Sequence, residues 1–316
     1  MTRRALPFCT LLLAAGCATA PATVDGILQQ HPGKTIAVAF YDLRDGRTFF
    51  RNEHEDFHAA STMKVPVMLG IFEAVSRGDL HLDQPVRVRN EFPSIYDGSI
   101  YSLDPKDDSD AAMYGYVGKD VPLEFLVRRM IDRSSNLATN NVIDLIGAKR
   151  VMDLMHRIGA EDIRVLRGVE DQKAFDHGMN NTTTATDLML IFRALAEHRI
   201  IDETSSRQMI GILAAQEFNS GIPAGLPPGT RVAHKTGWIT RIAHDAGIVF
   251  RPDGSAYVLV VLTRGFDDEN AAHRVIAQIS RAVWNGALTA LTPTAGRASG
   301  SRTPRSRPAR GAAPGS

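Results

Sequence analysis

The chain has 316 residues, of which 44% are hydrophobic and 22% charged, and its formal net charge is +1. These proportions are ordinary for a globular protein and argue against a collagen, a coiled coil or a wholly disordered chain. A length of this order allows one large domain or two interleaved domains. The small net charge gives no sign of a nucleic-acid partner, so none is expected.

The first residues have the pattern of an export signal. Arg3 and Arg4 precede a charge-free apolar run over 5–15, which is too short to cross a bilayer. Small residues then lead into Cys17, in a pattern that resembles the lipobox of bacterial lipoproteins. We therefore expect a signal peptide within 1–20, lipidation of Cys17, and a periplasmic protein tethered to a membrane by this anchor. Cleavage a few residues later, without lipidation, is the alternative.

Strands are predicted near both ends of the remaining chain, where apolar residues alternate between turn signals. The N-terminal pair surrounds the hairpin turn Asp45-Gly46, and the C-terminal pair surrounds Pro252-Asp253-Gly254. The four predicted strands are 35–41, 47–51, 243–251 and 256–263.

Apolar residues recur at helical spacing through the middle of the chain and again near its C-terminal end. The first such segment, 61–75, has Pro66 near its start, where a missing N–H costs least. The other predicted helices are 122–131, 136–146, 148–157, 185–197, 203–214 and 268–287. The stretch 86–120 is irregular, and its acidic residues predict a solvated loop because their spacing is not that of a calcium-binding EF-hand. These residues are Asp104, Asp107, Asp108 and Asp110.

This order of elements predicts one α/β domain over 24–291. Strands from 30–60 and 220–290 would form an antiparallel sheet flanked by helices, with an all-helical domain inserted over about 61–215. A cleft between two such lobes is a common place for an active site. Beyond this domain, 292–316 is rich in Pro, Gly, Ser and Arg, so we expect a disordered basic tail.

A pair of residues at the start of the first predicted helix suggests chemistry. Ser61 and Lys64 are three residues apart, so their side chains share one helical face. A serine hydroxyl is a weak nucleophile until a base accepts its proton, and a lysine can do so only where its pKa is lowered. Taken alone, the pair is equally compatible with an N-cap serine followed by a surface lysine.

Two further motifs strengthen the catalytic interpretation. Ser134-Ser135-Asn136 lies at the start of another predicted helix, and Lys235-Thr236-Gly237 precedes the C-terminal strands. In this order the motifs resemble the Ser-x-x-Lys, Ser-Asp-Asn and Lys-Thr-Gly elements of class A β-lactamases and penicillin-binding proteins. The chain is therefore identified as a class A β-lactamase-like serine hydrolase of the penicillin-recognising superfamily, and the resemblance covers roughly 30–290.

The resemblance implies a catalytic role for several matching residues. Ser61 would be the acylated nucleophile, and Lys64 its proton partner. Ser134 would relay a proton to the departing ring nitrogen of the substrate. The backbone amides of Ser61 and Trp238 would form the oxyanion hole, whose donors stabilise the developing negative charge.

The same resemblance implies a substrate-binding role for other residues. Asn136 would hold the side-chain amide of the substrate. Lys235 and Thr236 would face its carboxylate. Gly237 would let its strand approach the ligand closely, because glycine has no side chain.

Two features depart from the class A pattern. Ser135 stands where the pattern has an aspartate, so a carboxylate that braces the helix and the neighbouring loop is absent. Class A enzymes also use a loop glutamate as the base in deacylation, and the candidate here is Glu170, outside the family's Glu-x-x-x-Asn setting. The alternatives are a surface ion pair of Glu170 with Arg167 or Lys173, and Asp171 as the base.

The leading hypothesis is a serine β-lactamase that opens β-lactam rings through an acyl-enzyme on Ser61 and releases the product with water activated by Glu170. The alternatives are a D-alanyl-D-alanine carboxypeptidase or esterase of the same superfamily, and a slowly acylating, cell-wall-binding lipoprotein. The expected partners are a β-lactam or peptidoglycan-like small molecule and, through the anchor, a membrane; the protein is expected to be a monomer. No cofactor is expected, and no metal either, because the ten histidines lack zinc-ligand spacing.

Overall fold

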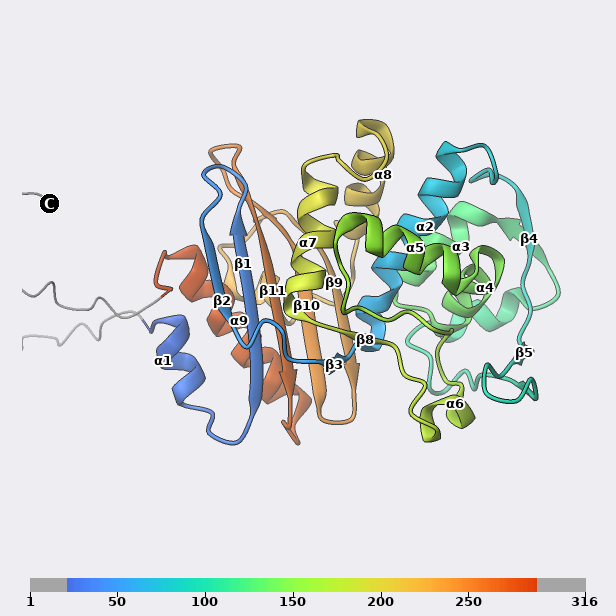
Figure 1. Ribbon diagram of the computed structural model, residues 1–316, viewed down its shortest axis with the longest axis horizontal. Coiled ribbons are helices and arrows are strands. Elements are labelled where there is room, and N and C mark those ends of the chain that lie inside the picture. The colour runs from blue at the N-terminus through green and yellow to red at the C-terminus, as the bar shows by residue number, and fades with distance from the viewer. Residues whose placement is uncertain (1–21, 289–316) are drawn as a thin grey trace, which may run out of the picture.

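The computed structural model describes residues 22–288. A five-stranded antiparallel sheet forms its centre, in the order β2-β1-β11-β10-β9 (Figure 1). Its strands are β1 Thr35–Asp42, β2 Thr48–Arg51, β9 Val232–Ile239, β10 Ile242–Phe250 and β11 Ala256–Arg264. Strands from the two ends of the chain meet where β1 pairs with β11, so the predicted sheet is confirmed.

Helices cover both faces of this sheet. Side chains alternate between the faces along each strand, and both faces carry apolar side chains that must be buried. Ile36 and Val38 of β1 belong to one apolar cluster, and Ala37 and Ala39 belong to the other. The covering helices are α1 Val24–Gln29 and α9 Glu269–Trp284 on the first face and α7 Ala185–Ala196 on the second (Figure 1). The sheet is therefore the middle layer of three.

A second lobe of helices packs beside β9, around α2. Its helices are α2 Lys64–Ser76, α3 Leu123–Asp132, α4 Asn136–Ile146, α5 Ala148–Ile158 and α8 Glu203–Leu213. Helix α2 contacts the other four and is buried on almost all sides, which explains why it is apolar all round. Pro66 is the third residue of α2, in the first turn, where proline is tolerated.

Several short elements connect the long ones. They are the 3-10 turns η1 Ala60–Met63, η2 Ala111–Tyr116 and η3 Ile222–Gly225, the helix α6 Gln172–Asp176, and three strand pairs, β3 Phe57–His58 with β8 Thr182–Thr183, β4 Pro85–Arg87 with β7 Asp120–Pro122, and β5 Phe92–Pro93 with β6 Ile100–Tyr101. The β3–β8 pair ties the segment before η1 to the end of a loop over 166–181, which we name the Glu170 loop. This pairing brings the end of the Glu170 loop beside η1.

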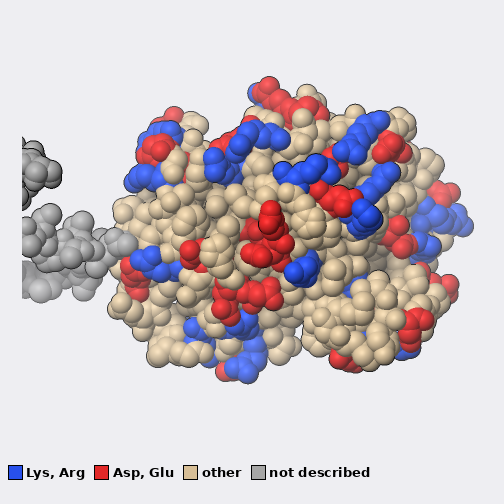
Figure 2. Space-filling model, viewed as in Figure 1, with Lys and Arg blue, Asp and Glu red and all other residues tan. Residues whose placement is uncertain are grey.

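The long predicted elements agree with the structure, whereas several short elements and the eight-residue strand β9 are absent from the elements predicted by pattern. Helices α1 and α6 span six and five residues, less than two turns each, so neither shows a clear period. The signal segment with Cys17 and the basic tail over 292–316 lie outside the described residues, and the domain limits at 24 and 291 stay a prediction. Within 22–288, no helix is long and apolar enough to cross a membrane. Figure 2 shows acidic and basic side chains interspersed over one face of the molecule.

Candidate active site

Ser61 lies in η1, directly before α2, and is half-buried. Strand β9 packs against this turn, since a Cβ atom placed on Gly237 would lie 2.8 Å from the Ser61 nitrogen and 3.0 Å from the Thr62 nitrogen. Glycine at this position therefore lets the strand approach the nucleophile segment, in addition to any approach to a ligand. The Ser61 amide makes no hydrogen bond to any other residue of the described chain, which leaves it available to a substrate oxygen.

Lys64 is fully buried at the first position of α2. Its amine donates hydrogen bonds to the Ser134 carbonyl oxygen at 2.6 Å, the Ser134 hydroxyl at 3.2 Å and the Asn136 side-chain oxygen at 2.9 Å. Burial lowers the pKa of Lys64 to about 7, and the charges of Asp108 and Glu170 oppose this shift only in part. Near neutral pH a large fraction of Lys64 can thus be uncharged and able to accept a proton.

Lys235 approaches the same serine from β9. This lysine is also fully buried, and its amine donates to the Ser134 hydroxyl at 3.0 Å and to the Thr236 carbonyl oxygen at 3.0 Å. Burial, together with the neighbouring charge of Lys64, holds the pKa of Lys235 well below its usual value. The Ser134 hydroxyl therefore accepts from two amines and keeps its own proton free for a third group.

Glu170 faces the site from the Glu170 loop. Its carboxylate accepts a hydrogen bond from the side-chain nitrogen of Asn136, whose oxygen accepts from Lys64. The residue as a whole is exposed, but the loss of hydration around its carboxyl group raises its pKa to about 7. One amide thus links two groups that both titrate near neutral pH.

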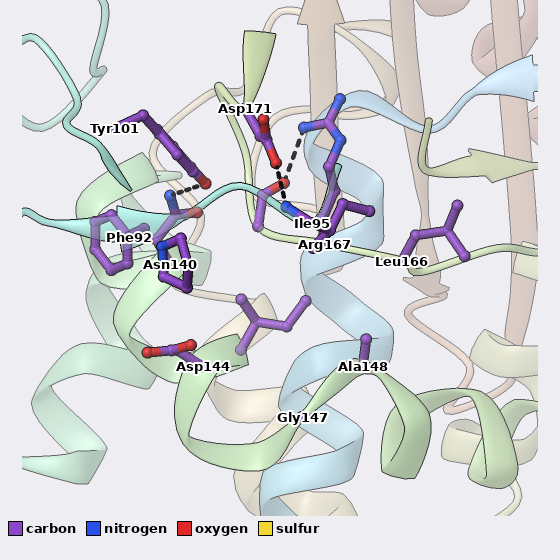
Figure 3. Close-up of a pocket in the computed structure, with 13 residues that line it drawn as sticks. Phe92, Ile95, Tyr101, Asn140, Asp144, Gly147, Ala148, Leu166, Arg167 and Asp171 are labelled. Carbon is purple, nitrogen blue, oxygen red and sulfur yellow. Dashed lines mark hydrogen bonds between the residues drawn. The ribbon is translucent and has the colours of Figure 1, made fainter. Parts of the chain in front are cut away.

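Helix α4 holds Glu170 from behind. Asn140 accepts a hydrogen bond from the Val169 nitrogen at 2.7 Å and donates to the Val169 oxygen at 3.1 Å. A Cβ atom on Gly168 would collide with the Asn140 side chain, so glycine is needed there. Tyr101 donates to the Val169 oxygen at 3.2 Å, and Figure 3 shows Tyr101 and Asn140 pointing toward each other at a pocket of about 200 Å³ behind the loop.

The ion pair that the sequence offered as an alternative for Glu170 does not form in the structure. Lys173 forms an ion pair with Asp97 at 2.8 Å, and Arg167 donates to backbone oxygens of the loop. Asp171 points to the opposite side, where it caps α6 and accepts hydrogen bonds from the 94–95 turn (Figure 3). Neither basic residue pairs with Glu170, and Asp171 is buried among its own partners.

The edge of the sheet supplies the remaining predicted residues. The Thr236 hydroxyl is buried and has no hydrogen-bond partner within residues 22–288, so it can donate to a ligand. Trp238 is partly exposed and packs edge-on against Phe218, with ring centroids 5.0 Å apart. The structure thus brings Thr236 and Trp238 to the end of β9 beside η1.

The carboxylate that Ser135 does not provide comes from elsewhere in the chain. Asp108 is 7% exposed and accepts hydrogen bonds from the Leu137 nitrogen at 2.8 Å and the Ser135 hydroxyl at 3.3 Å. The prediction that the acidic residues of 104–110 are all solvated is therefore wrong for Asp108 and for Asp110, which is 3% exposed. No spacing in the sequence indicates these contacts, because they join segments almost thirty residues apart.

The sequence model of the β-lactamase enzyme family matches residues 20–287. The chain belongs to this family. Its sequence is similar to the extended-spectrum β-lactamase PER-1 of Pseudomonas aeruginosa, at 24% identity over 82% of this chain and 85% of that protein.

Solved structures of similar fold support this assignment. PBP-A is 26% identical with a TM-score of 0.71, covering 83% of this chain and 94% of its own. A variant of PBP-A was solved as an acyl-enzyme complex with penicillin G. A β-lactamase from Sphaerobacter thermophilus is 26% identical with a TM-score of 0.70, covering 85% of this chain and 98% of its own. The fold and the family therefore agree with the predicted class A β-lactamase-like hydrolase.

Proposed function

We propose that the protein is a serine β-lactamase that acylates Ser61 and then hydrolyses the acyl-enzyme. The observation that carries the proposal is the chain of contacts from Lys64 through Asn136 to Glu170. Two groups with pKa values near 7 flank one amide, so the site holds a base for each half of a hydrolytic cycle. Membership of the β-lactamase enzyme family supports the substrate class.

Acylation would use the two lysines and Ser134. The uncharged Lys64 amine takes the proton of Ser61, whose oxygen attacks the β-lactam carbonyl carbon. The amides of Ser61 and Trp238 stabilise the oxyanion, and a single donor of this kind is worth about 3–4 kcal/mol of barrier. As the ring C–N bond breaks, Ser134 gives its proton to the nitrogen and regains one from Lys64, along their hydrogen bond.

Substrate binding would rest on β9 and on the start of α4. The ammonium of Lys235 and the unpartnered Thr236 hydroxyl fit a substrate carboxylate. The Asn136 amide fits the side-chain amide of a β-lactam, in addition to its two protein contacts. No step requires a cofactor.

Deacylation would depend on Glu170. Its carboxylate takes a proton from a water molecule, whose oxygen attacks the ester carbonyl. The ester C–O bond breaks, Ser61 regains the proton that Glu170 took from the water, and the ring-opened acid leaves. A carboxyl with a pKa near 7 suits this task because it is ionised for part of the time at neutral pH yet remains a strong enough base.

A D-alanyl-D-alanine carboxypeptidase of the same superfamily is the second candidate. The absence of an aspartate at Ser135 favours it, since the penicillin-binding pattern accepts a non-acidic residue there. The similarity to PBP-A also favours it. This enzyme would form the same acyl-enzyme with a β-lactam but release it slowly.

One experiment separates the two candidates. Purified mature protein is mixed with a chromogenic cephalosporin and with a fluorescent penicillin, beside Ser61→Ala and Glu170→Gln variants. A β-lactamase turns over many equivalents, loses turnover and labelling in Ser61→Ala, and accumulates labelled acyl-enzyme in Glu170→Gln. Stable labelling without turnover in the unchanged protein assigns the carboxypeptidase, and absence of Ser61-dependent labelling contradicts both.

We also infer that the protein is exported to the periplasm, held there by a lipid on Cys17 and monomeric. The signal pattern within 1–20 supports export, and the small residues before Cys17 support lipidation. Fractionation of cells that express the protein and its Cys17→Ser variant tests the anchor. The variant should move from the membrane to the soluble periplasmic fraction, and an unchanged distribution would contradict lipidation.

A further inference from the structure

Asp108 comes from a loop far from the three motifs, yet its carboxylate is buried at the N-terminus of α4. One carboxylate oxygen accepts from the Leu137 nitrogen at 2.8 Å and from the Ser135 hydroxyl at 3.3 Å. The other accepts from the Asp110 nitrogen at 2.9 Å. Burial of a carboxylate is costly unless such donors replace its hydration, and a helix N-terminus favours negative charge. These contacts therefore form a specific site for this carboxylate.

The neighbours of Asp108 hold the same segment. The Ser109 hydroxyl lies 2.7 Å from the Arg133 oxygen and 3.1 Å from the Ser134 oxygen, to which it donates. Asp110 forms an ion pair with Arg129 at 2.8 Å. Asp108 and Ser109 thus hold the backbone on both sides of Ser134, and Asp110 ties their loop to α3.

Ser134 needs this support because its backbone is strained. Its φ is 57°, in the left-handed region that residues with a side chain rarely adopt unless their surroundings enforce it. In this conformation its hydroxyl meets both Lys64 and Lys235, and Asn136 reaches Lys64 and Glu170. A shift of the segment would disturb both sets of contacts at once.

We propose that Asp108 is a positioning residue whose carboxylate holds Ser134-Ser135-Asn136 in the reactive conformation, and so replaces from another part of the chain the carboxylate that Ser135 does not provide. The inference rests on the proposed β-lactamase function. It also explains the serine, because a carboxylate at position 135 would lie within hydrogen-bond distance of Asp108, where two negative charges repel.

The charge of Asp108 gives a readout that a merely structural residue would lack. It raises the pKa of Lys64, against the effect of burial, and raises the pKa of Glu170. The other charges acting on these groups are those of Lys235, of Asp107, and of Lys64 and Glu170 on each other. Removal of the Asp108 charge lowers both pKa values, so the acid limb of the pH–activity profile moves to lower pH.

A double-variant cycle tests the proposal on the mature protein. The variants are Asp108→Ala, Asp108→Asn, Ser135→Asp and the combination Asp108→Ala with Ser135→Asp. Asp104→Asn is the matched control, because Asp104 lies exposed on the same loop. Turnover of a chromogenic cephalosporin gives kcat and KM at several pH values, labelling by a fluorescent penicillin gives acylation, and a thermal melt reports folding.

The expected pattern is one of mutual compensation. Asp108→Ala should lower kcat/KM about 100-fold, as a displaced catalytic group does, and Ser135→Asp alone about 10-fold. The combination should return to within about fivefold of the unchanged protein, because the carboxylate now comes from the helix, where aspartate is a good N-cap. Asp108→Asn should also shift the acid limb to lower pH, and Asp104→Asn should change nothing.

Several results would overturn the proposal. One is a folded Asp108→Asn or Asp108→Ala variant with unchanged kcat/KM and pH profile. Another is a combination no better than Asp108→Ala alone. If Asp108→Ala does not fold, the combination decides: a folded, active protein supports the proposal, while a folded, inactive or an unfolded one overturns it. Failure of the β-lactamase proposal is seen separately, in the unchanged protein, as stable labelling without turnover or as no labelling by penicillin.

Discussion

The two sides of the active site are built differently. Ser61, Lys64 and Lys235, the residues proposed for acylation, lie where η1, α2 and β9 pack together, and both lysines are fully buried. Glu170, the residue proposed for deacylation, lies exposed on a loop, has a φ of 61° and depends on the contacts of Asn140 with the neighbouring Val169. The residues proposed for acylation are therefore held by the core, whereas the residue proposed for deacylation is held by a few hydrogen bonds.

This difference predicts that acylation and deacylation can be lost separately. A change in the loop should leave a protein that still takes up a β-lactam but does not release it. A change at the β9–η1 contact should abolish both, because no acyl-enzyme forms. The variants below are ordered by the size of the expected effect on this separation.

Gly237→Val should have the largest effect. The added Cβ would lie 2.8 Å from the Ser61 nitrogen, so either β9 or η1 must shift. A displacement of about 1 Å at a catalytic centre costs about 100-fold in rate, and valine adds further bulk, so acylation should fall about 1,000-fold. Stopped-flow labelling with a fluorescent penicillin measures it. Gly211→Ala is the control, since a Cβ there meets no atom within 4 Å, and normal acylation in Gly237→Val would show that the contact is dispensable.

Asn140→Ala should separate the two half-reactions. It removes both contacts with Val169 and frees Glu170, so deacylation should slow about 100-fold while acylation changes less than threefold. Asn141→Ala is a matched control, because Asn141 lies next to it on α4 and holds Arg89 in the same two-sided way. The measurement is the half-life of the labelled acyl-enzyme. Equal half-lives in the two variants would contradict the assigned role.

The pH dependence of activity should also separate acylation from deacylation. Glu170 acts as a base only when ionised, and Lys64 only when uncharged, and both pKa values are near 7. Activity should therefore fall about tenfold for each unit below about pH 6. Glu170→Gln should remove this limb from deacylation and keep it in acylation. A flat profile between pH 5 and 8 in the unchanged protein would contradict the raised pKa of Glu170 and the lowered pKa of Lys64.

Tyr101→Phe should have the smallest effect. Its hydroxyl donates to the Val169 oxygen and accepts from Asn140, so its loss weakens the support behind the loop without removing it. A neutral hydrogen bond of this kind contributes about 1 kcal/mol, which corresponds to about a fivefold shorter or longer lifetime. We expect deacylation to slow by this factor and acylation to stay unchanged. An effect on acylation alone would show that Tyr101 acts elsewhere.

Much of the fold follows from patterns that are local in the sequence. The β1–β2 hairpin follows from alternation around Asp45-Gly46, and α4 follows from helical spacing after Ser135. The positions of Ser61, Lys64 and Lys235 follow from motifs of three or four residues. The Glu170 loop was located by its place between motifs, but its partner Asn136 was not foreseen.

The contacts that complete the site could not be predicted in this way. Asp108 looks like one member of a solvated acidic loop, and Asn140 like an ordinary polar residue of a helix. Each gains its function from a segment almost thirty residues away that lies beside it only after folding. Neither composition nor the spacing of residues indicates such a contact.

The order of the elements and the resemblance to the family could be read from the sequence alone, as could the prediction of Ser61 and Lys64 as nucleophile and proton partner, because all of these depend on side chains close together along the chain. Only the tertiary structure decided the ionisation of Lys64 and Glu170, the need for Gly168 and Gly237, and the source of the carboxylate beside Ser135. These depend on burial and on distances across the fold. Both are set by the way the helical lobe packs against the sheet.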